Sequence, residues 1–141
     1  MLLLATTGME EKFSKMIRPL AGVLLLLILL QGASGSQKMT GIDWNLSHKH
    51  VAHLLTVLAI LMPVVAIKSG IDDSSIKGNS FAVAGIAVLQ FVVGTYMMKD
   101  DWSWGWLHAP LAMMMAAHAF AILILARRTL ETGTEISDTG T

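Results

Sequence analysis

Four long apolar stretches alternate with short polar segments along the chain. They cover residues 17–35, 47–67, 80–98 and 105–126. Each is close to the ~20 residues that a helix needs to cross a bilayer, and none alternates with the period of two that a lipid-facing strand would show. The pattern therefore predicts an all-α membrane protein, a bundle of four transmembrane helices.

Three segments follow from this pattern. Residues 1–16 form a cytoplasmic N-terminal segment, and residues 17–127 form the four-helix transmembrane domain. Residues 128–141 are polar and lack a helical period, so we predict a mobile C-terminal tail.

The first apolar span has a second interpretation. Lys12, Lys15 and Arg18 precede it and the small residues 32–35 end it, as in a cleavable signal peptide. Whether residues 1–34 are retained in the mature protein is therefore open. The internal repeat described below requires this span, so we keep it as a helix.

Basic residues predict the orientation in the membrane, because they are enriched in cytoplasmic loops. With both termini inside, seven lie on the inner side: Lys12, Lys15, Arg18, Lys68, Lys77, Arg127 and Arg128. Three lie on the outer side: Lys38, Lys49 and Lys99. This excess predicts cytoplasmic termini. The four tryptophans then form one outer interfacial belt: Trp44, Trp102, Trp104 and Trp106.

Composition narrows the possible functions. Apolar residues make up 54% of the 141 residues and charged residues 14%, against about 25% charged in an ordinary soluble domain. Ten basic residues balance ten acidic ones, so the chain has no excess positive charge for nucleic acid. With no cysteine, disulfides, iron–sulfur clusters, thiolate zinc sites and a cysteine nucleophile are excluded.

The two halves of the membrane domain contain a short repeated pattern. Residues 30–35 and 89–94 both read Leu-Gln, three residues, Gly. A polar stretch with Asp-Trp follows each, and then a histidine, His48 or His108. An alanine lies four residues beyond each histidine. The fold is thus predicted to consist of two pseudo-repeated helical hairpins.

The repeat gives the two histidines equivalent positions. His48 and His108 lie at the outer ends of the second and fourth helices, which run in the same direction and enter the bilayer at the same depth. A pseudo-twofold axis along the membrane normal brings these helices face to face. Two imidazoles arranged in this way can supply both axial ligands of a haem iron.

The other three histidines lack such a partner. His53 and His118 lie deeper in the membrane and are not equivalent in the repeat. Ionisable residues at such depth normally face the bundle interior. For His118 a hydrogen bond to a neighbouring helix is as good an interpretation as a functional role. His50 lies on a different helical face from His48 and is predicted to meet solvent, a haem propionate or a partner.

Other metal sites fit the sequence less well. His48, His50 and His53 lie on different faces of one helix, so they cannot converge on a zinc or copper ion. The run Met113–Met115 points in three directions, as expected of methionines that fill gaps in helix packing or contact lipid.

These residues resemble the haem A synthase family, whose members have two similar four-helix halves. The resemblance covers residues 19–127 and rests on short motifs: Leu30-Gln31, Gly35, Thr40-Gly41, His48-Lys49 and Ala52 in the first hairpin, and Leu89-Gln90, Gly94, His108 and Leu111-Ala112 in the second. It implies a half-length form with His48 and His108 as axial ligands of a b-type haem iron.

Two positions depart from the family's pattern. The family has an arginine, a candidate clamp for a haem propionate, where this chain has Lys49, which keeps the charge but not the bidentate fork. Active members have a glutamate at the position of Asn45, and an amide cannot act as a carboxylate. Asp43 can substitute only if its loop folds back. The resemblance therefore supports haem binding by this chain better than it supports catalysis.

Three functions follow as expectations. The first is a b-type haem protein in a prokaryotic plasma membrane, an electron-transfer or accessory subunit of a respiratory complex, with other membrane subunits or a second copy of itself as partners. The second is a half-size haem A synthase, an oxidoreductase that oxidises a haem methyl group as a homodimer. The third is a haem-free structural subunit.

Overall fold

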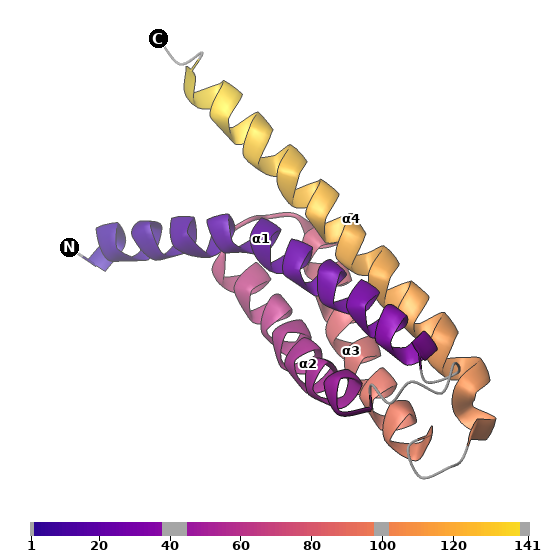
Figure 1. The fold of residues 1–141 in the computed structure, drawn as a ribbon. Helices are drawn as coiled ribbons and strands as arrows, with labels where there is room; N and C mark the ends of the chain where they lie inside the picture. The colour runs from indigo at the N-terminus through magenta and orange to yellow at the C-terminus, as the bar shows by residue number, and fades with distance from the viewer. Residues whose placement is uncertain (1, 38–44, 98–101, 139–141) are drawn as a thin grey trace.

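The computed structural model confirms the all-helical fold. It describes the backbone of residues 2–37, 45–97 and 102–138, and the side chains of residues 8–36, 48–97 and 103–129. These residues form four α-helices and a short 3₁₀ helix: α1 (Leu2–Gln37), α2 (Asn45–Lys68), α3 (Ser74–Met97), η2 (Trp102–Trp104) and α4 (Gly105–Asp138) (Figure 1).

All four helices are longer than the apolar spans that predicted them, α1 and α4 by the most. α1 begins at Leu2, well before the span at residues 17–35, and α4 continues to Asp138, beyond the predicted end at Ala126. The segments predicted as 1–16 and 128–141 are therefore largely helical in their backbone. Residues 139–141, and the side chains beyond Thr129, lie outside the described residues.

Each helix is adjacent to two others. α1 packs on α2 and α4, and α3 packs on the same two helices, so α2 and α4 face one another diagonally. Both termini lie at the same end of the bundle (Figure 1). Sixteen buried apolar side chains form one core shared by all four helices: Ile17, Ala21, Leu24, Ile28, Leu55, Ala59, Met62, Val65, Ala66, Ile76, Val83, Ala87, Met115, Ala119, Ile122 and Ala126.

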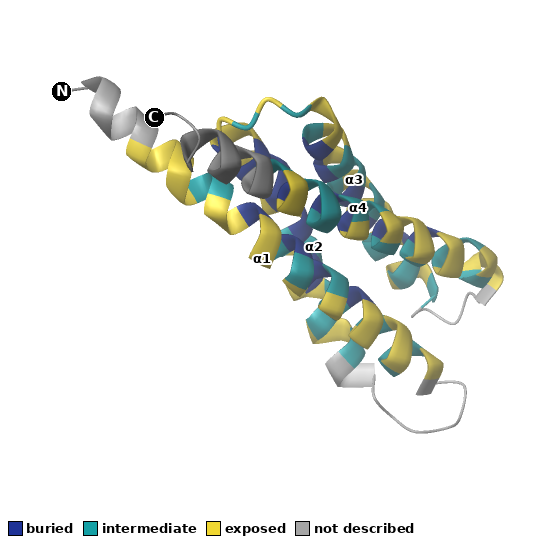
Figure 2. Cartoon of the chain, turned by 90° about the horizontal axis from the view of Figure 1, so that it is seen from above, coloured by how far each residue is buried: buried dark blue, intermediate teal, exposed yellow. Residues whose placement is uncertain are grey.

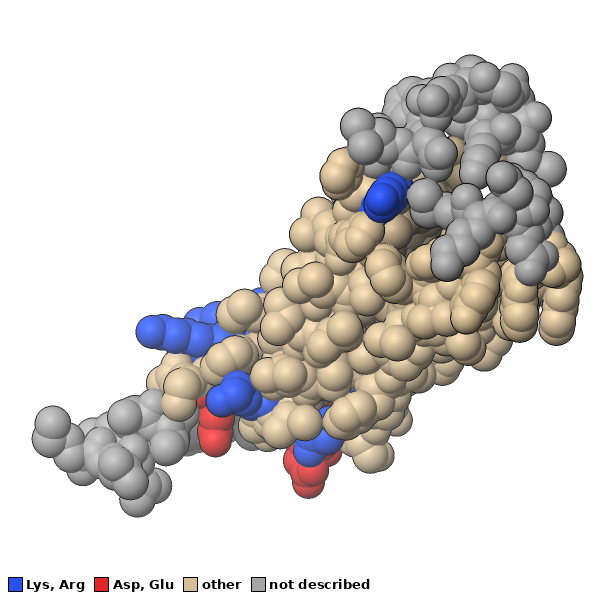
Figure 3. Space-filling view, turned by 90° about the horizontal axis from the view of Figure 1, so that it is seen from below, with Lys and Arg blue, Asp and Glu red and all other residues tan. Residues whose placement is uncertain are grey.

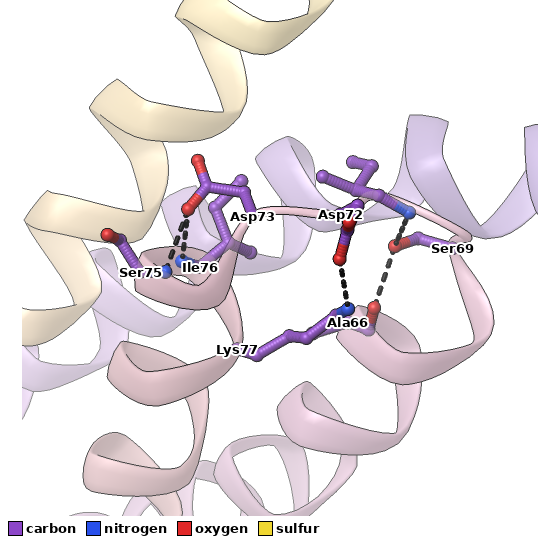
Figure 4. A network of polar contacts seen from close by, with 8 residues as sticks. Ala66, Ser69, Asp72, Asp73, Ser75, Ile76 and Lys77 are labelled. Carbon is purple, nitrogen blue, oxygen red and sulfur yellow. Dashed lines mark hydrogen bonds and ion pairs between the residues drawn. The ribbon is translucent and has the colours of Figure 1, made fainter.

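A tight turn connects α2 to α3, and its polar groups are paired (Figure 4). Gly70 has a φ of 68°, which a residue without Cβ adopts at little cost after a helix end. The Ser69 hydroxyl donates to the Ala66 carbonyl at 2.7 Å. The Asp73 carboxylate accepts hydrogen bonds from the N–H groups of Ser75 and Ile76 at 2.8 and 3.2 Å, which caps α3.

The N-terminal part of α1 crosses this turn. A Cβ added at Gly70 would lie 3.1 Å from Oε2 of Glu10, and the Lys68 ammonium lies 5.8 Å from the centroid of the Phe13 ring. α1 contains Pro19, which removes one helical hydrogen bond and bends a helix. Figure 1 shows α1 bending part-way along its length.

The exterior of the bundle is apolar between its ends. All four helices contain a stretch long and apolar enough to cross a membrane. Large apolar side chains on every helix are exposed, among them Leu29, Ile67, Phe81 and Phe120. In Figure 3 the charged side chains of the described residues lie toward the two ends of the face seen, with an uncharged band between them. These features are those of a multi-pass integral membrane protein whose surroundings are lipid.

Candidate functional site

The internal repeat is present in the packing of the first and third helices. The residues of α1 in the shared core are Ile17, Ala21, Leu24 and Ile28. The residues 59 positions further along are Ile76, Ser80, Val83 and Ala87, and all four are buried in α3. The two helices thus bury the same face at the same register.

The second and fourth helices repeat in the same way with an offset of 60. Leu55, Ala59, Met62 and Ala66 of α2 are buried, and so are Met115, Ala119, Ile122 and Ala126 of α4. The difference of one between the two offsets corresponds to one extra residue between Gly94 and His108, compared with the stretch between Gly35 and His48. This agreement supports two pseudo-equivalent hairpins much more strongly than the short sequence motifs do.

His48 and His108 occupy equivalent positions in these hairpins. Each is the fourth residue of its helix, and each side chain is half-buried. A Cβ added at Gly35 would lie 3.2 Å from Cε1 of His48, and a Cβ added at Gly94 would lie 3.2 Å from Cε1 of His108. Each imidazole therefore lies against the backbone of the preceding helix, at a point where glycine leaves room for it.

The two imidazoles belong to helices that face one another diagonally. The shared core ends about two helical turns away from them, at Ile28, Leu55, Ala87 and Met115. In Figure 2 the α1–α2 hairpin and the α3–α4 hairpin diverge from one another away from the end of the bundle that carries the chain termini. The histidines thus lie beyond the end of the shared core.

Hydrogen bonding differs between the two histidines. Nδ1 of His48 lies 3.0 Å from the Ser34 hydroxyl, which is also 3.2 Å from the Gln31 carbonyl oxygen. In the second hairpin, Nδ1 of His108 and Oε1 of Gln90 are buried, and neither has a hydrogen-bond partner among the described residues. A buried polar atom without a partner is costly and requires an explanation.

The remaining histidines on α2 point elsewhere. Nδ1 of His53 lies 2.7 Å from the Lys49 carbonyl, and the ring contacts Phe91 of α3 edge-on, with 5.0 Å between centroids. His48 instead contacts α1, so the two side chains do not converge. His50 is exposed, in agreement with its predicted position on another face.

His118 forms a hydrogen bond to a neighbouring helix, one of the two interpretations that the sequence left open. Its Nδ1 lies 2.7 Å from Oδ1 of Asn79 in α3. The Asn79 amide nitrogen donates to the Ser75 carbonyl at 2.7 Å. Because that carbonyl can only accept, the amide orientation is fixed and His118 carries its proton on Nδ1.

Other predicted site residues stay predictions. Lys49 is exposed on α2, one residue from His48, as a propionate clamp would have to be. The side chain of Asn45, the first residue of α2, and the whole of Asp43 lie outside the described residues. Two of the four tryptophans have described side chains: Trp104 stacks on Tyr96 with 6.0 Å between centroids, and Trp106 is largely exposed.

Sequence reasoning did not single out Ser34, Asn79 or the difference between Gln31 and Gln90. The repeat contained the signal for Ser34, because its equivalent 59 positions later is Val93, a residue without a hydroxyl. Asn79 had no such signal, since its contact with His118 depends on how α3 and α4 pack.

Comparisons of the chain with protein-family models, with curated proteins and with solved structures give no match. The resemblance to haem A synthases is therefore an expectation from the sequence motifs alone.

Proposed function

We propose that this chain is an integral membrane b-type haem protein in which His48 and His108 supply the two axial imidazoles. The observation that carries this proposal is the equivalence of the two side chains. Both come from the fourth residue of diagonal helices and both lie against a glycine of the preceding helix. Two such histidines at equivalent positions of diagonal helices in a membrane bundle are the donor set that a low-spin haem takes.

The residues present suit this group in a second respect. The Ser34 hydroxyl has a single proton and lies within hydrogen-bond distance of the Gln31 carbonyl, which can only accept. With its proton directed to that carbonyl, the hydroxyl accepts a hydrogen bond from Nδ1–H of His48, and the lone pair of this imidazole is then on Nε2. A neutral imidazole with Nδ1 hydrogen-bonded and Nε2 basic is the form that ligates iron.

The role that follows is electron transfer, as a subunit of a membrane complex. A bound haem would supply a one-electron redox centre. The residues of this chain would hold it between two hairpins and exclude water on the lipid side, and the exposed Lys49 would provide a positive charge for a propionate.

The test is spectroscopic and needs no knowledge of partners. The full chain, produced in a haem-sufficient host and purified in detergent, is expected to show a reduced-minus-oxidised spectrum of low-spin haem, identified as haem b after extraction. His48→Ala and His108→Ala should each abolish the low-spin spectrum. His50→Ala, an exposed histidine two residues from His48, is the matched control and should retain it. A colourless wild-type chain, or a full low-spin spectrum in His108→Ala, would contradict the proposal.

The half-size haem A synthase is the second candidate, favoured by the family resemblance. Oxidation of a haem methyl group in that family depends on a carboxylate at the position of Asn45, and exchange of carboxylate for amide removes both a base and a negative charge. We therefore expect no haem A in a host that makes haem O and lacks its own synthase. Haem A that accumulates with this chain and disappears on Asp43→Asn would restore the enzymatic function.

A further inference from the structure

The two hairpins differ at one position beside the proposed ligands. Ser34 of α1 and Val93 of α3 are equivalent in the repeat, and each comes one residue before the glycine that accommodates a histidine. Ser34 carries a hydroxyl 3.0 Å from His48 Nδ1. Val93 is 3% exposed and has only methyl groups to offer.

In the first hairpin the hydroxyl connects two polar groups. Ser34 Oγ lies 3.2 Å from the Gln31 carbonyl oxygen, 3.4 Å from the Gln31 side-chain oxygen and 3.0 Å from His48 Nδ1. Both oxygens of Gln31 are acceptors, so the single hydroxyl proton goes to one of them. In that arrangement the imidazole is the donor, with its proton on Nδ1.

The second hairpin has the equivalent glutamine and histidine but no hydroxyl between them. Gln90 corresponds to Gln31, and His108 corresponds to His48. Oε1 of Gln90 and Nδ1 of His108 are the two side-chain atoms that are buried and unpartnered in the described part of the chain. Both lie in the hairpin where the hydroxyl is replaced by Val93. One substitution within the repeat accounts for both unpartnered atoms.

We propose that Ser34 is a positioning residue that fixes His48 as the Nδ1–H tautomer, and that Val93 leaves His108 without this constraint. The two imidazoles are therefore unequal, although their backbone positions are equivalent. An imidazole that donates from Nδ1 to an acceptor is more basic at Nε2 and is held in one ring orientation. His48 is the stronger and more rigid donor of the pair, and His108 is the weaker one.

The consequence for a bound haem rests on the proposed function. A more basic axial imidazole stabilises ferric relative to ferrous iron, so the midpoint potential falls as the Nδ1 hydrogen bond strengthens. Two reciprocal exchanges follow from the repeat. Ser34→Val makes the first hairpin like the second and should raise the potential. Val93→Ser makes the second like the first and should lower it.

The tautomer can be measured without haem. Imidazole nitrogen-15 chemical shifts of the haem-free full chain in detergent distinguish Nδ1–H from Nε2–H. We expect His48 to be Nδ1–H in the wild type and in Ser34→Thr, which keeps the hydroxyl, and to become a mixture in Ser34→Val. Val93→Ser should shift His108 toward Nδ1–H. Thr56→Val is the matched control, because it removes a hydroxyl that donates to the Ala52 carbonyl and should leave both tautomers unchanged.

The outcomes separate this inference from the proposed function. His48 found as Nε2–H in the wild type, or unchanged by Ser34→Val, would overturn the positioning role. Val93→Ser provides a second test if Ser34→Val fails to fold, and an unchanged His108 there would also count against the inference. Tautomers that follow the exchanges in a chain that binds no haem would support the positioning role and overturn the haem function. Potentials that shift in opposite directions in the two exchanges would support both.

Discussion

At the scale of single residues, the sequence predicted His48 and His108 as candidate haem ligands. It did not predict the polar side chains that lie beside the histidines. His48 and His108 could be found from residue spacing alone. A helix rises by a fixed distance per residue, so equal spacing in the two halves of the repeat predicts the same depth for both histidines. The contacts of Ser34 with His48 and of Asn79 with His118 depend on side-chain rotamers and on the distance between packed helices. Neither the rotamers nor the interhelical distances can be obtained from residue spacing in the sequence.

The glycines beside the histidines give the prediction at this scale. A Cβ at Gly94 would meet His108 Cε1 at 3.2 Å, whereas a Cβ at Gly85 of the same helix would meet nothing within 4 Å. Gly85→Ala should raise the free energy of unfolding by about 0.5–1 kcal/mol, the usual gain for Gly to Ala inside a helix. Gly94→Ala should raise the free energy of unfolding by less, because the His108 imidazole must shift by a few tenths of an ångström to accommodate the new Cβ.

The first hairpin offers the same comparison with Gly35→Ala and its control Gly32→Ala. Unfolding titrations in mixed detergent measure the stability, and the low-spin absorbance measures haem occupancy. The expected result is reduced occupancy in Gly35→Ala and Gly94→Ala with full occupancy in both controls. Equal occupancy in all four variants would show that the rings do not need the space the glycines leave.

At the scale of elements, the apolar spans predicted the existence, order and direction of all four helices. They did not predict the true ends of α1 and α4, because the polar residues that extend these helices carry no apolar signal. Lys12 and Lys15, for example, are helical by propensity and by local pairs such as the 2.6 Å contact between Lys15 and Glu11. Membrane burial defines only the part of a helix that lies in lipid.

The His118–Asn79 hydrogen bond joins α3 to α4 and gives the prediction at this scale. Hydrogen bonds between transmembrane helices contribute on average about 0.6 kcal/mol and at most about 1.7 kcal/mol. A double-mutant cycle of His118→Ala and Asn79→Ala should give a coupling energy in this range. The bond lies far along α4 from His108, so neither variant should change the low-spin spectrum.

A coupling energy indistinguishable from zero would mean that the two side chains do not bond in the membrane. Loss of the haem spectrum in His118→Ala, with the fold retained, would instead assign this histidine to the cofactor. That result would favour the functional interpretation of His118 that the sequence left open.

At the scale of the whole molecule, the arrangement of the helices and the distribution of basic residues together predict the orientation in the membrane. Four helices place both termini and the α2–α3 turn at one end, and the C-terminal ends of α1 and α3 at the other (Figure 1). Seven of the ten basic residues fall at the end with the termini. The positive-inside rule predicts that this end lies in the cytoplasm, which would place His48 and His108 near the outer surface.

Cysteine labelling tests this orientation directly, because the chain has no native cysteine. Ser74 at the start of α3 and Ser103 within η2 are both exposed and lie at opposite ends of the bundle. An impermeant maleimide added to intact cells should label Ser103→Cys and leave Ser74→Cys unlabelled until the membrane is opened. The unsubstituted chain is the control for background. Labelling of Ser74→Cys from outside, with Ser103→Cys protected, would reverse the topology and place both proposed haem ligands near the cytoplasmic surface.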